Sequence, residues 1–439
     1  MKNIFILIGF ILFQQVTAQQ ITISGGFEPK DNAAAYVAVL GNMGQKNVLA
    51  ESKVSEGKFS MSLPQDTPQG VYKLALGMQD KVYFYWLHTG QSSYELVFKY
   101  QKNKWYIEGK NNKEYDYLNK TIIKEDSLMV AIGVLYYTIG NYPEKKSKFI
   151  TDAKTLLDTK TKEFQDFRNT ALIKAPLLVK EVLNQNNIYF YDPTWDNETI
   201  EKKTAIVFWD NVPQNDTSYY KKPFFGDKLD QYFGSYNEDK IMPEQEKYLK
   251  IQNKVSQIIE KFAQHPQKNQ LYNLMVRYFF SIQYPQICQV IDPFLDKNKL
   301  LSPDDVKGFE YRMAQKELIN QKAPSILNAT TNEALTINTK EKNYLVFVGD
   351  NTPFSSAVLQ QLKTETQNND AIQVTAILFS DNAESIQNFK TQFPTWNIQT
   401  QVAKTAEETI KKYKLSYVPT VFEIDKNNTI VKIVKPFEK

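Results

Sequence analysis

The sequence is poor in the residues that build redox and metal sites. Its 439 residues include one cysteine, Cys288, and two histidines, His88 and His265. A single cysteine excludes an intramolecular disulfide, so stability has to come from packed apolar cores. These three residues are far apart in the sequence, and a zinc site built from histidine and cysteine is therefore not expected. We expect no cofactor.

The sequence also lacks a dense basic tract and a long apolar run. Lysine and arginine total 53 against 49 acidic residues, and this thinly spread excess does not favour nucleic acid as a partner. The apolar run from Ile4 to Phe13 is shorter than the roughly 20 residues of a membrane-spanning helix. It lies between Lys2 and the small residues of Val16-Thr17-Ala18, the pattern of an export signal. We expect residues 1–18 to be a signal peptide cleaved after Ala18, and the protein to lie in the periplasm or cell envelope without a membrane span.

The remaining residues suffice for several packed domains and predict a multidomain α+β protein. Hydrophobic residues make up 42% and aromatic residues 13%. Over residues 19–112, short alternating runs such as Lys58 to Leu63 are separated by turn signals, which predicts an antiparallel β-sandwich. Over residues 113–320, apolar residues recur at helical spacing, as between Val255 and Phe262, which predicts a helical domain.

Residues 321–439 alternate between strand and helix patterns. Buried strands are predicted at Tyr344 to Val348 and Val374 to Phe379, with helices beginning near Ser355 and Ala383. A hairpin is expected around Asp425-Lys426-Asn427-Asn428, where asparagine suits positive backbone angles. This order predicts an α/β layered domain.

Short motifs in this last region resemble those of exported bacterial thioredoxin-like proteins of the TlpA type. Lys322-Ala323-Pro324-Ser325-Ile326 resembles the segment that leads into that domain, and Tyr417-Val418-Pro419-Thr420-Val421 resembles its cis-proline segment. The strand at Tyr344 to Val348 then places Thr352-Pro353-Phe354-Ser355 where the family has Cys-x-x-Cys. The order of β-rich, helical and thioredoxin-like regions is also similar. The resemblance implies a thioredoxin-like domain with Pro419 as its cis-proline.

The replacement of both cysteines decides the expected function. Thiol-disulfide exchange needs a thiolate nucleophile and a resolving thiol. Thr352 and Ser355 offer hydroxyls, which need a nearby base to act as nucleophiles, and no histidine follows His265. We therefore expect no catalytic residues, and a non-catalytic protein-binding or scaffold protein whose partner is another envelope protein or an extended peptide. Pairing of such a peptide with backbone beside Pro419 needs no thiol.

Two other interpretations remain open. The chain could belong to a thiol-disulfide oxidoreductase system and act with the thiols of a partner. It could also be a glycan- or peptide-binding module, because Tyr83-Phe84-Tyr85-Trp86, with His88 after them, could form a stacking surface. Against the second stands the more common role of such a strand, which is to fill a sandwich core.

Neither the two acidic pairs nor the single cysteine is predicted to form a metal or catalytic site. Asp210 with Asp216, or Asp304 with Asp305, could bind calcium, but neither pair has the spacing of a calcium loop. Ser302-Pro303-Asp304-Asp305 instead predicts a helix start with Ser302 as N-cap. We expect Cys288 to be a small buried apolar residue on a helix.

Overall fold

The computed structural model describes residues 20–41, 48–78, 82–101, 104–110, 112–185, 188–213, 215–217, 219–238, 241–300, 302–328, 333–337, 340–349, 352–367 and 369–437. The predicted signal peptide lies outside these residues. The fold is mixed α+β, with three sheets and twelve α-helices in this part of the chain. The chain divides into two compact units, one comprising residues up to 213 with 221–224, the other residues 214–220 and 225–439. The predicted boundaries at residues 112 and 320 stay a prediction.

The first unit begins with two four-stranded sheets, whose strand orders are β4-β1-β7-β8 and β3-β2-β5-β6. Along β4, buried and exposed residues alternate at every position, as expected for a strand with one face in a core. Rings of β6 and β7 meet between the sheets, with Phe84 5.5 Å from Phe98 and Trp86 5.1 Å from Tyr94. The two sheets therefore pack face to face. The strands are β1 (Gln20–Glu28), β2 (Tyr36–Leu40), β3 (Val48–Lys53), β4 (Lys58–Pro64), β5 (Gly70–Leu76), β6 (Val82–His88), β7 (Ser93–Gln101) and β8 (Lys104–Gly109).

One strand pair differs from the antiparallel sandwich expected from the sequence. Strands β1 and β7 run parallel, with Ile23 opposite Tyr94. A parallel pair needs a long crossover between its strands. Here the crossover contains β2, β3, β5 and β6, the whole second sheet, as well as β4. Alternation of apolar residues does not reveal strand direction, and the prediction of a purely antiparallel sandwich was wrong in this respect.

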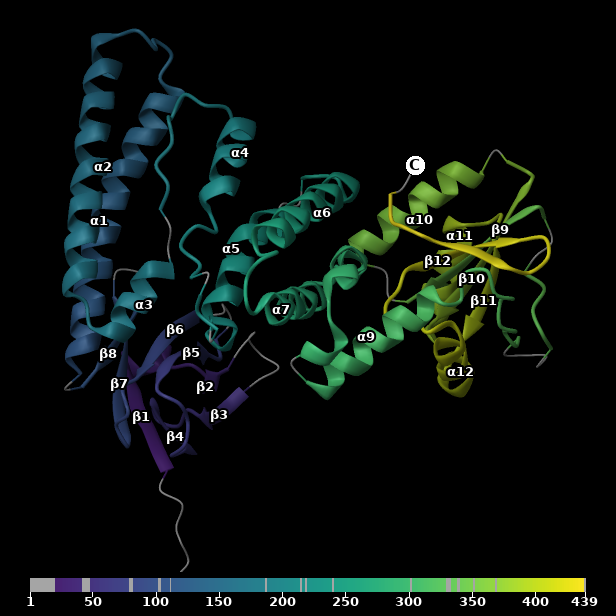
Figure 1. Ribbon diagram of the computed structural model, residues 1–439, viewed down its shortest axis with the longest axis horizontal. Helices are drawn as coiled ribbons and strands as arrows, with labels where there is room; N and C mark the ends of the chain where they lie inside the picture. Colours follow the sequence, from purple (N-terminus) through teal and green to yellow (C-terminus); the bar gives the residue numbers. More distant parts are fainter. Residues whose placement is uncertain are drawn as a thin grey trace, which may run out of the picture. The chain divides into compact units, whose positions relative to one another are not determined.

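Four helices follow in the same unit: α1 (Lys113–Asn141), α2 (Lys148–Lys174), α3 (Leu177–Gln185) and α4 (Asn197–Val207). The Asn112 side chain caps α1 by accepting from the backbone N–H groups of Glu114 and Tyr115. The two long helices α1 and α2 lie side by side as a hairpin (Figure 1) around an apolar core that includes Leu128, Ile132 and Leu157.

The second unit starts with helices α5 (Phe224–Glu238), α6 (Glu244–Lys261), α7 (Lys268–Ser281), α8 (Cys288–Ile291) and α9 (Pro303–Lys316). A buried ion pair ties α9 to the short segment after α8. The Arg312 guanidinium donates to both carboxylate oxygens of Asp292 at 2.8 to 3.1 Å. None of the helices in the described ranges has the length and hydropathy of a membrane-crossing segment.

The rest of this unit is a five-stranded sheet with helices between its strands. The strand order is β11-β10-β9-β12-β13. Strands β9, β10 and β11 run parallel, whereas β12 is antiparallel to both β9 and β13. The elements are β9 (Lys342–Val348), α10 (Pro353–Thr366), β10 (Ile372–Phe379), α11 (Ala383–Gln392), β11 (Asn397–Gln401), α12 (Ala403–Tyr413), β12 (Thr420–Asp425) and β13 (Ile430–Val434).

Helices cover both faces of this sheet. Leu359 and Leu362 of α10 and Phe389 of α11 pack on one face, and Tyr413 of α12 packs on the other. Nearly every residue of β9 is buried, as expected for a central strand covered on both sides. The alternating helices, the parallel strands and the antiparallel final hairpin form the thioredoxin-like layered fold expected from the sequence (Figure 1).

A covered turn beside the cis-proline loop

The Thr352-Pro353-Phe354-Ser355 segment forms the first turn of α10, directly after the end of β9. Thr352 is the N-cap, and its hydroxyl accepts a hydrogen bond from the backbone N–H of Ser355 at 3.1 Å. Pro353 occupies the first helical position, where its missing N–H costs no hydrogen bond. The Thr352 and Ser355 hydroxyl oxygens are 2.9 Å apart and form a hydrogen bond. The two positions predicted to replace the cysteines therefore lie side by side.

The loop before β12 lies next to this turn. The Val418–Pro419 peptide bond is cis, and Thr420, the residue after it, pairs with Phe347 near the end of β9. A Cβ atom added to Gly349 would lie 2.9 Å from a methyl group of Val418. Pro419 therefore lies beside the end of the strand that leads into the Thr352 to Ser355 turn.

Aromatic rings from distant parts of the chain cover the turn. The Phe354 ring lies 5.5 Å from that of Tyr248 on α6, 5.3 Å from that of Tyr284 and 5.8 Å from that of Phe437. Only 4% of Phe354 and 3% of Ser355 is exposed to solvent. We call Tyr248, Tyr284, Phe354 and Phe437 the aromatic cluster. Its rings separate this part of the turn from solvent.

Polar groups of the helical segment also bind the cis-proline loop. The Gln286 side-chain amide donates to the backbone carbonyl of Val418 at 3.3 Å. The Gln289 amide donates to the Tyr417 hydroxyl at 2.6 Å. Burial raises the pKa of Tyr417, so this phenol stays protonated. The carbonyl next to Pro419, which an extended peptide would use for strand-like pairing, therefore already has a donor from the same chain.

The single thiol belongs to the same helical segment. Cys288 begins α8, is fully buried, and its sulfur lies 4.0 Å from the backbone carbonyl of Val276. Burial raises the pKa of the Cys288 thiol, which keeps it protonated and unreactive at neutral pH. The prediction of a small buried residue on a helix is confirmed.

The chemistry available at the turn follows from these contacts. Among the described residues, the Thr352 hydroxyl bonds only to groups of Ser355, and none of these is a base. The sequence predicted the position of the turn and of Pro419, but it gave no indication of Tyr248, Tyr284, Gln286 or Phe437. The one local signal was Phe354 itself, because a large apolar ring in an exposed turn is unfavourable unless something covers it.

The aromatic strand β6 contributes to a core. Trp86 and His88 are both buried, and their rings stack at 5.1 Å. The His88 Nδ1 atom lies 2.8 Å from the Tyr94 hydroxyl, and burial lowers the pKa of His88. Because the Trp86 indole lies within the sandwich, it offers no surface on which a sugar could stack.

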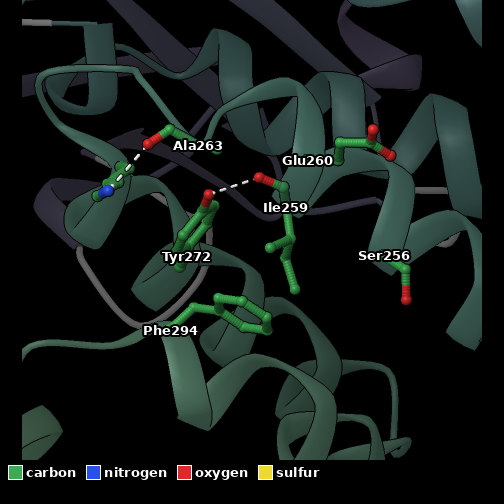
Figure 2. A pocket seen from close by; sticks show the side chains of 7 residues that line it. Ser256, Ile259, Glu260, Ala263, Tyr272 and Phe294 are labelled. Carbon is green, nitrogen blue, oxygen red and sulfur yellow. Dashed lines mark hydrogen bonds between the residues drawn. The ribbon is translucent and has the colours of Figure 1, made fainter.

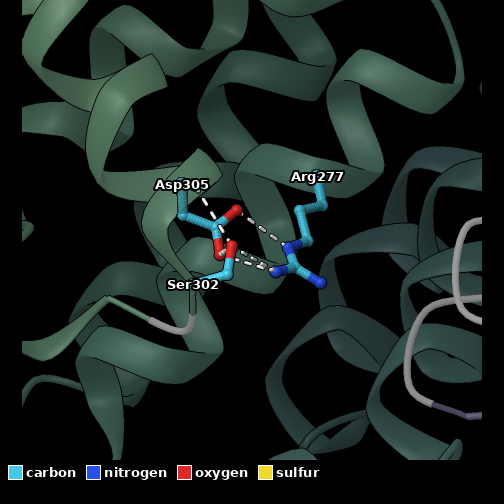
Figure 3. Close-up of polar contacts among 3 residues, drawn as sticks. All are labelled: Arg277, Ser302 and Asp305. Carbon is cyan, nitrogen blue, oxygen red and sulfur yellow. Dashed lines mark hydrogen bonds and ion pairs between the residues drawn. The ribbon is translucent and has the colours of Figure 1, made fainter.

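The acidic pair at residues 304–305 belongs to a helix start, as predicted. Ser302 is the N-cap of α9 and accepts from the Asp305 N–H, and Pro303 is in the first turn. The Asp305 carboxylate also accepts two hydrogen bonds from the Arg277 guanidinium, at 2.6 and 2.9 Å (Figure 3). Burial opposes ionisation of Asp305, but these hydrogen bonds outweigh it and lower the pKa. The described ranges contain no cluster of three or more metal-ligating side chains.

A separate apolar pocket of about 290 Å³ lies between α6 and α7 (Figure 2). The Tyr272 hydroxyl at its wall donates to the Ile259 carbonyl, and the Lys268 ammonium donates to the Ala263 carbonyl. These polar groups are thus engaged with backbone, which leaves a shallow apolar surface. The lining residues are Ser256, Ile259, Glu260, Ala263, Lys268, Tyr272 and Phe294.

Comparison with known proteins gives structural likenesses. No protein-family model matches the chain, and no curated protein does. A thioredoxin-like protein from Bacteroides caccae is similar at 15% identity, over 58% of this chain and 94% of that chain, with a TM-score of 0.28. A thiol-disulfide oxidoreductase from Bacteroides fragilis is similar at 19% identity, over 27% of this chain and 92% of that chain, with a TM-score of 0.22. The thioredoxin domain of a thiol-disulfide oxidoreductase from Bacteroides vulgatus is similar at 11% identity, over 26% of this chain and 86% of that chain, with a TM-score of 0.23. The thioredoxin-like fold of the second unit rests on its own strand order and on the helix that follows β9.

Proposed function

We propose that this chain is an exported, non-catalytic protein-binding or scaffold protein of the periplasm or cell envelope. Its thioredoxin-like domain serves as a platform on which the helical segment of the same unit is fixed. The observation that carries the proposal is the covered turn: Phe354 lies in the aromatic cluster, and Gln286 binds the carbonyl beside Pro419. The cover buries Phe354 and Ser355, whereas Thr352 stays half-buried and Pro353 exposed, so a protein substrate would reach only the outer edge of this turn.

The first experiment asks whether the chain performs thiol chemistry. We expect the mature protein to reduce insulin no faster than buffer, because its one thiol, Cys288, is buried and protonated. The Cys288→Ala variant should behave identically. Insulin reduction or peroxide turnover above background, whether it survives Cys288→Ala or not, would contradict a non-catalytic role.

The second experiment tests the cover itself, using cysteines placed at two equivalent helix positions in the Cys288→Ala background. Ser355 and Ser385 each donate their backbone N–H to an N-cap side chain, Thr352 and Asn382 respectively. The pKa of a thiol at either position would be lowered by a helix N-terminus in the same way. Ser355 is buried, whereas Ser385 is exposed.

We expect Ser355→Cys to react with a thiol reagent at least about 100-fold more slowly than Ser385→Cys, because modification requires local opening. In denaturant the two rates should become equal. Equal rates under native conditions would show that the turn is accessible and would remove the main support for the proposal.

The location and the partner need separate measurements. If the protein is exported as proposed, its mass in the native envelope fraction corresponds to a chain that begins at Gln19. A pull-down from that fraction with the wild-type protein should retain a partner. Whether that partner has reactive thiols tests the alternative in which this chain assists an oxidoreductase system. A partner with a reactive thiol pair that cross-links to this chain would favour that alternative.

A further inference from the structure

The outer face of α1 carries large apolar side chains that are exposed to solvent. We call Ile123, Val130, Val134 and Tyr137 the outer stripe. Their exposed fractions are 53%, 66%, 61% and 73%. Leu128, Ile132 and Ile139, on the opposite side of the same helix, are buried in the core with α2. At 100° per residue the outer stripe lies roughly 180° from Ile132, so α1 is apolar on two opposite faces.

The absence of charge extends over half of this helix. From Ser127 to Pro143, 17 consecutive residues carry no charged side chain. A helix with one face on a core normally places charged residues on the other. Val130, Val134 and Tyr137 are neighbours on this face at helical spacing, and exposed apolar surface of this kind on a folded protein marks an interaction site. No other described residue of the first unit covers the outer stripe, which therefore calls for a partner.

Its spacing fits another α-helix. Ile123, Val130 and Tyr137 are seven residues apart, and Val134 is four residues after Val130. An apolar repeat of seven residues keeps the same face toward a second helix over several turns. A helix that lies on a membrane is typically rich in lysine and arginine. The α1–α2 hairpin, residues 113–174, has eleven basic and nine acidic residues, a difference of only two, and so does not favour a lipid surface.

We propose that the outer stripe is the interface of a symmetric homodimer in which α1 of one copy packs antiparallel on α1 of a second copy. The distribution of charge decides the direction. Lys120, Lys124 and Asp126 all lie in the N-terminal half of α1. A parallel, in-register pair would place each of these charges opposite its own copy, which is unfavourable. An antiparallel pair places them opposite the uncharged half.

Symmetry then fixes the register. With Val130 on the two-fold axis, residue i of one copy lies opposite residue 260 − i of the other, so Ile123 faces Tyr137 of the second copy. Val134 then faces Asp126, whose carboxylate is paired with Lys104 of its own chain at 3.5 Å. The stripe is about 21 Å long at 1.5 Å per residue. Two helices in contact over that length bury on the order of 800–1,000 Å² in total, less than the roughly 1,200 Å² of stable interfaces and within the range of weak, transient ones. We therefore expect a dimer with a dissociation constant in the micromolar range.

Sedimentation equilibrium of the mature protein tests the dimer. We expect a concentration-dependent mass between monomer and dimer from about 1 to 200 µM. The Val130→Glu/Val134→Glu variant should weaken the association at least about tenfold, because it buries two like charges near the axis. The matched control, Ile173→Glu/Leu177→Glu, changes two side chains that are somewhat more exposed and lie off the stripe, and should leave the dimer intact. Circular dichroism checks that each variant is folded.

Disulfide cross-linking tests the direction. Val130→Cys should form a covalent dimer on mild oxidation, since the two sulfurs would meet at the axis. Ile123→Cys alone should not, whereas Ile123→Cys/Tyr137→Cys should. The native Cys288 is buried and does not interfere. Efficient cross-linking of Ile123→Cys alone would overturn the antiparallel arrangement. A monomer at all concentrations, or binding of the stripe to anionic vesicles without self-association, would overturn the dimer.

Discussion

Replacing Phe354 with alanine tests whether the aromatic cluster holds the helical segment on the thioredoxin-like domain. The Phe354 side chain is almost fully buried and contacts three rings of the cluster. A buried phenylalanine removes roughly 200 Å² from water, which is about 5 kcal/mol at ~25 cal/mol per Å². The alanine methyl retains part of this, and truncations of this kind cost about 3–5 kcal/mol in practice. We expect a loss of that size in the free energy of unfolding of the second unit.

Cys288 provides the readout without any engineered label. It is the one cysteine of the sequence, it is fully buried, and it lies in the second unit. A thiol reagent modifies it only when this unit opens, so the labelling rate follows the free energy of opening. Because about 1.4 kcal/mol corresponds to a factor of ten, Phe354→Ala should accelerate labelling about 100- to 4,000-fold.

A control in the first unit separates this effect from a general loss of stability. Phe98→Ala removes an equally buried ring from β7, and the labelling rate of Cys288 should then stay within about threefold of wild type. An acceleration of less than about tenfold for Phe354→Ala would refute the reasoning, because the ring would then contribute too little to keep the turn covered.

Three further predictions concern the stability of the second unit. Arg312→Met leaves the Asp292 carboxylate buried without its cation, so urea unfolding should show a loss of about 3–5 kcal/mol, most of which Asp292→Leu in the same chain should restore. Burial alone would raise the pKa of the Asp305 carboxyl, but its hydrogen bonds, of which that from Arg277 is the strongest, lower the pKa by more. The folded-state pKa therefore lies below the ordinary ~3.9. The stability that the Asp305 carboxylate contributes is complete above about pH 5 and is lost as the pH falls through the folded-state pKa. The thermal midpoint should therefore decrease less between pH 5 and pH 3 for Asp305→Asn than for wild type. A Cβ atom at Gly234 of α5 meets nothing within 4 Å, so Gly234→Ala should raise stability by about 1 kcal/mol in the same unfolding assay.

Segments with a strong apolar period were predictable from the sequence. Lys58 to Leu63 alternates because every second residue of β4 enters the sandwich core. The run from Val255 to Phe262 follows α6, of which Val255, Ile258 and Ile259 are buried. In each case the side chains that define the pattern are those that the core buries, so the local signal and the tertiary structure agree.

Two edge strands were missed, and both lack that signal. Strand β11, with the sequence Asn-Ile-Gln-Thr-Gln, is held at the sheet edge by backbone pairing with β10. Strand β3 lies at the edge of its own sheet and has no fully buried residue. An edge strand has one neighbour and little burial, so composition alone does not distinguish it from a loop. The hairpin tip was predictable, because Asn428 adopts φ of +60°.

Prediction of the site from the sequence was limited in a different way. The turn residues and Pro419 follow from short local motifs, but the cover does not. Tyr248 precedes Phe354 by 106 residues and Phe437 follows it by 83. Such contacts depend on how α6 and the C-terminal segment fold against α10, and no sequence period encodes them. The turn motif alone therefore gave no indication of the rings that bury Phe354.

If Thr352 and Ser355 replace a cysteine pair, as proposed, that replacement and the cover depend on each other. A turn that exchanges disulfides with other proteins has to expose its sulfurs, and the apolar surface around them then stays in contact with water. Under the proposed replacement by Thr352 and Ser355, exposure would have no chemical use. Burying Phe354 under Tyr248 and Tyr284 stabilises the fold by the free energy of apolar burial. We therefore expect Thr352→Cys/Ser355→Cys alone to reduce insulin slowly, because position 355 is buried beside Phe354 under the aromatic cluster while position 352 is half-buried. Adding Tyr284→Ala, which opens the cluster, should raise the rate.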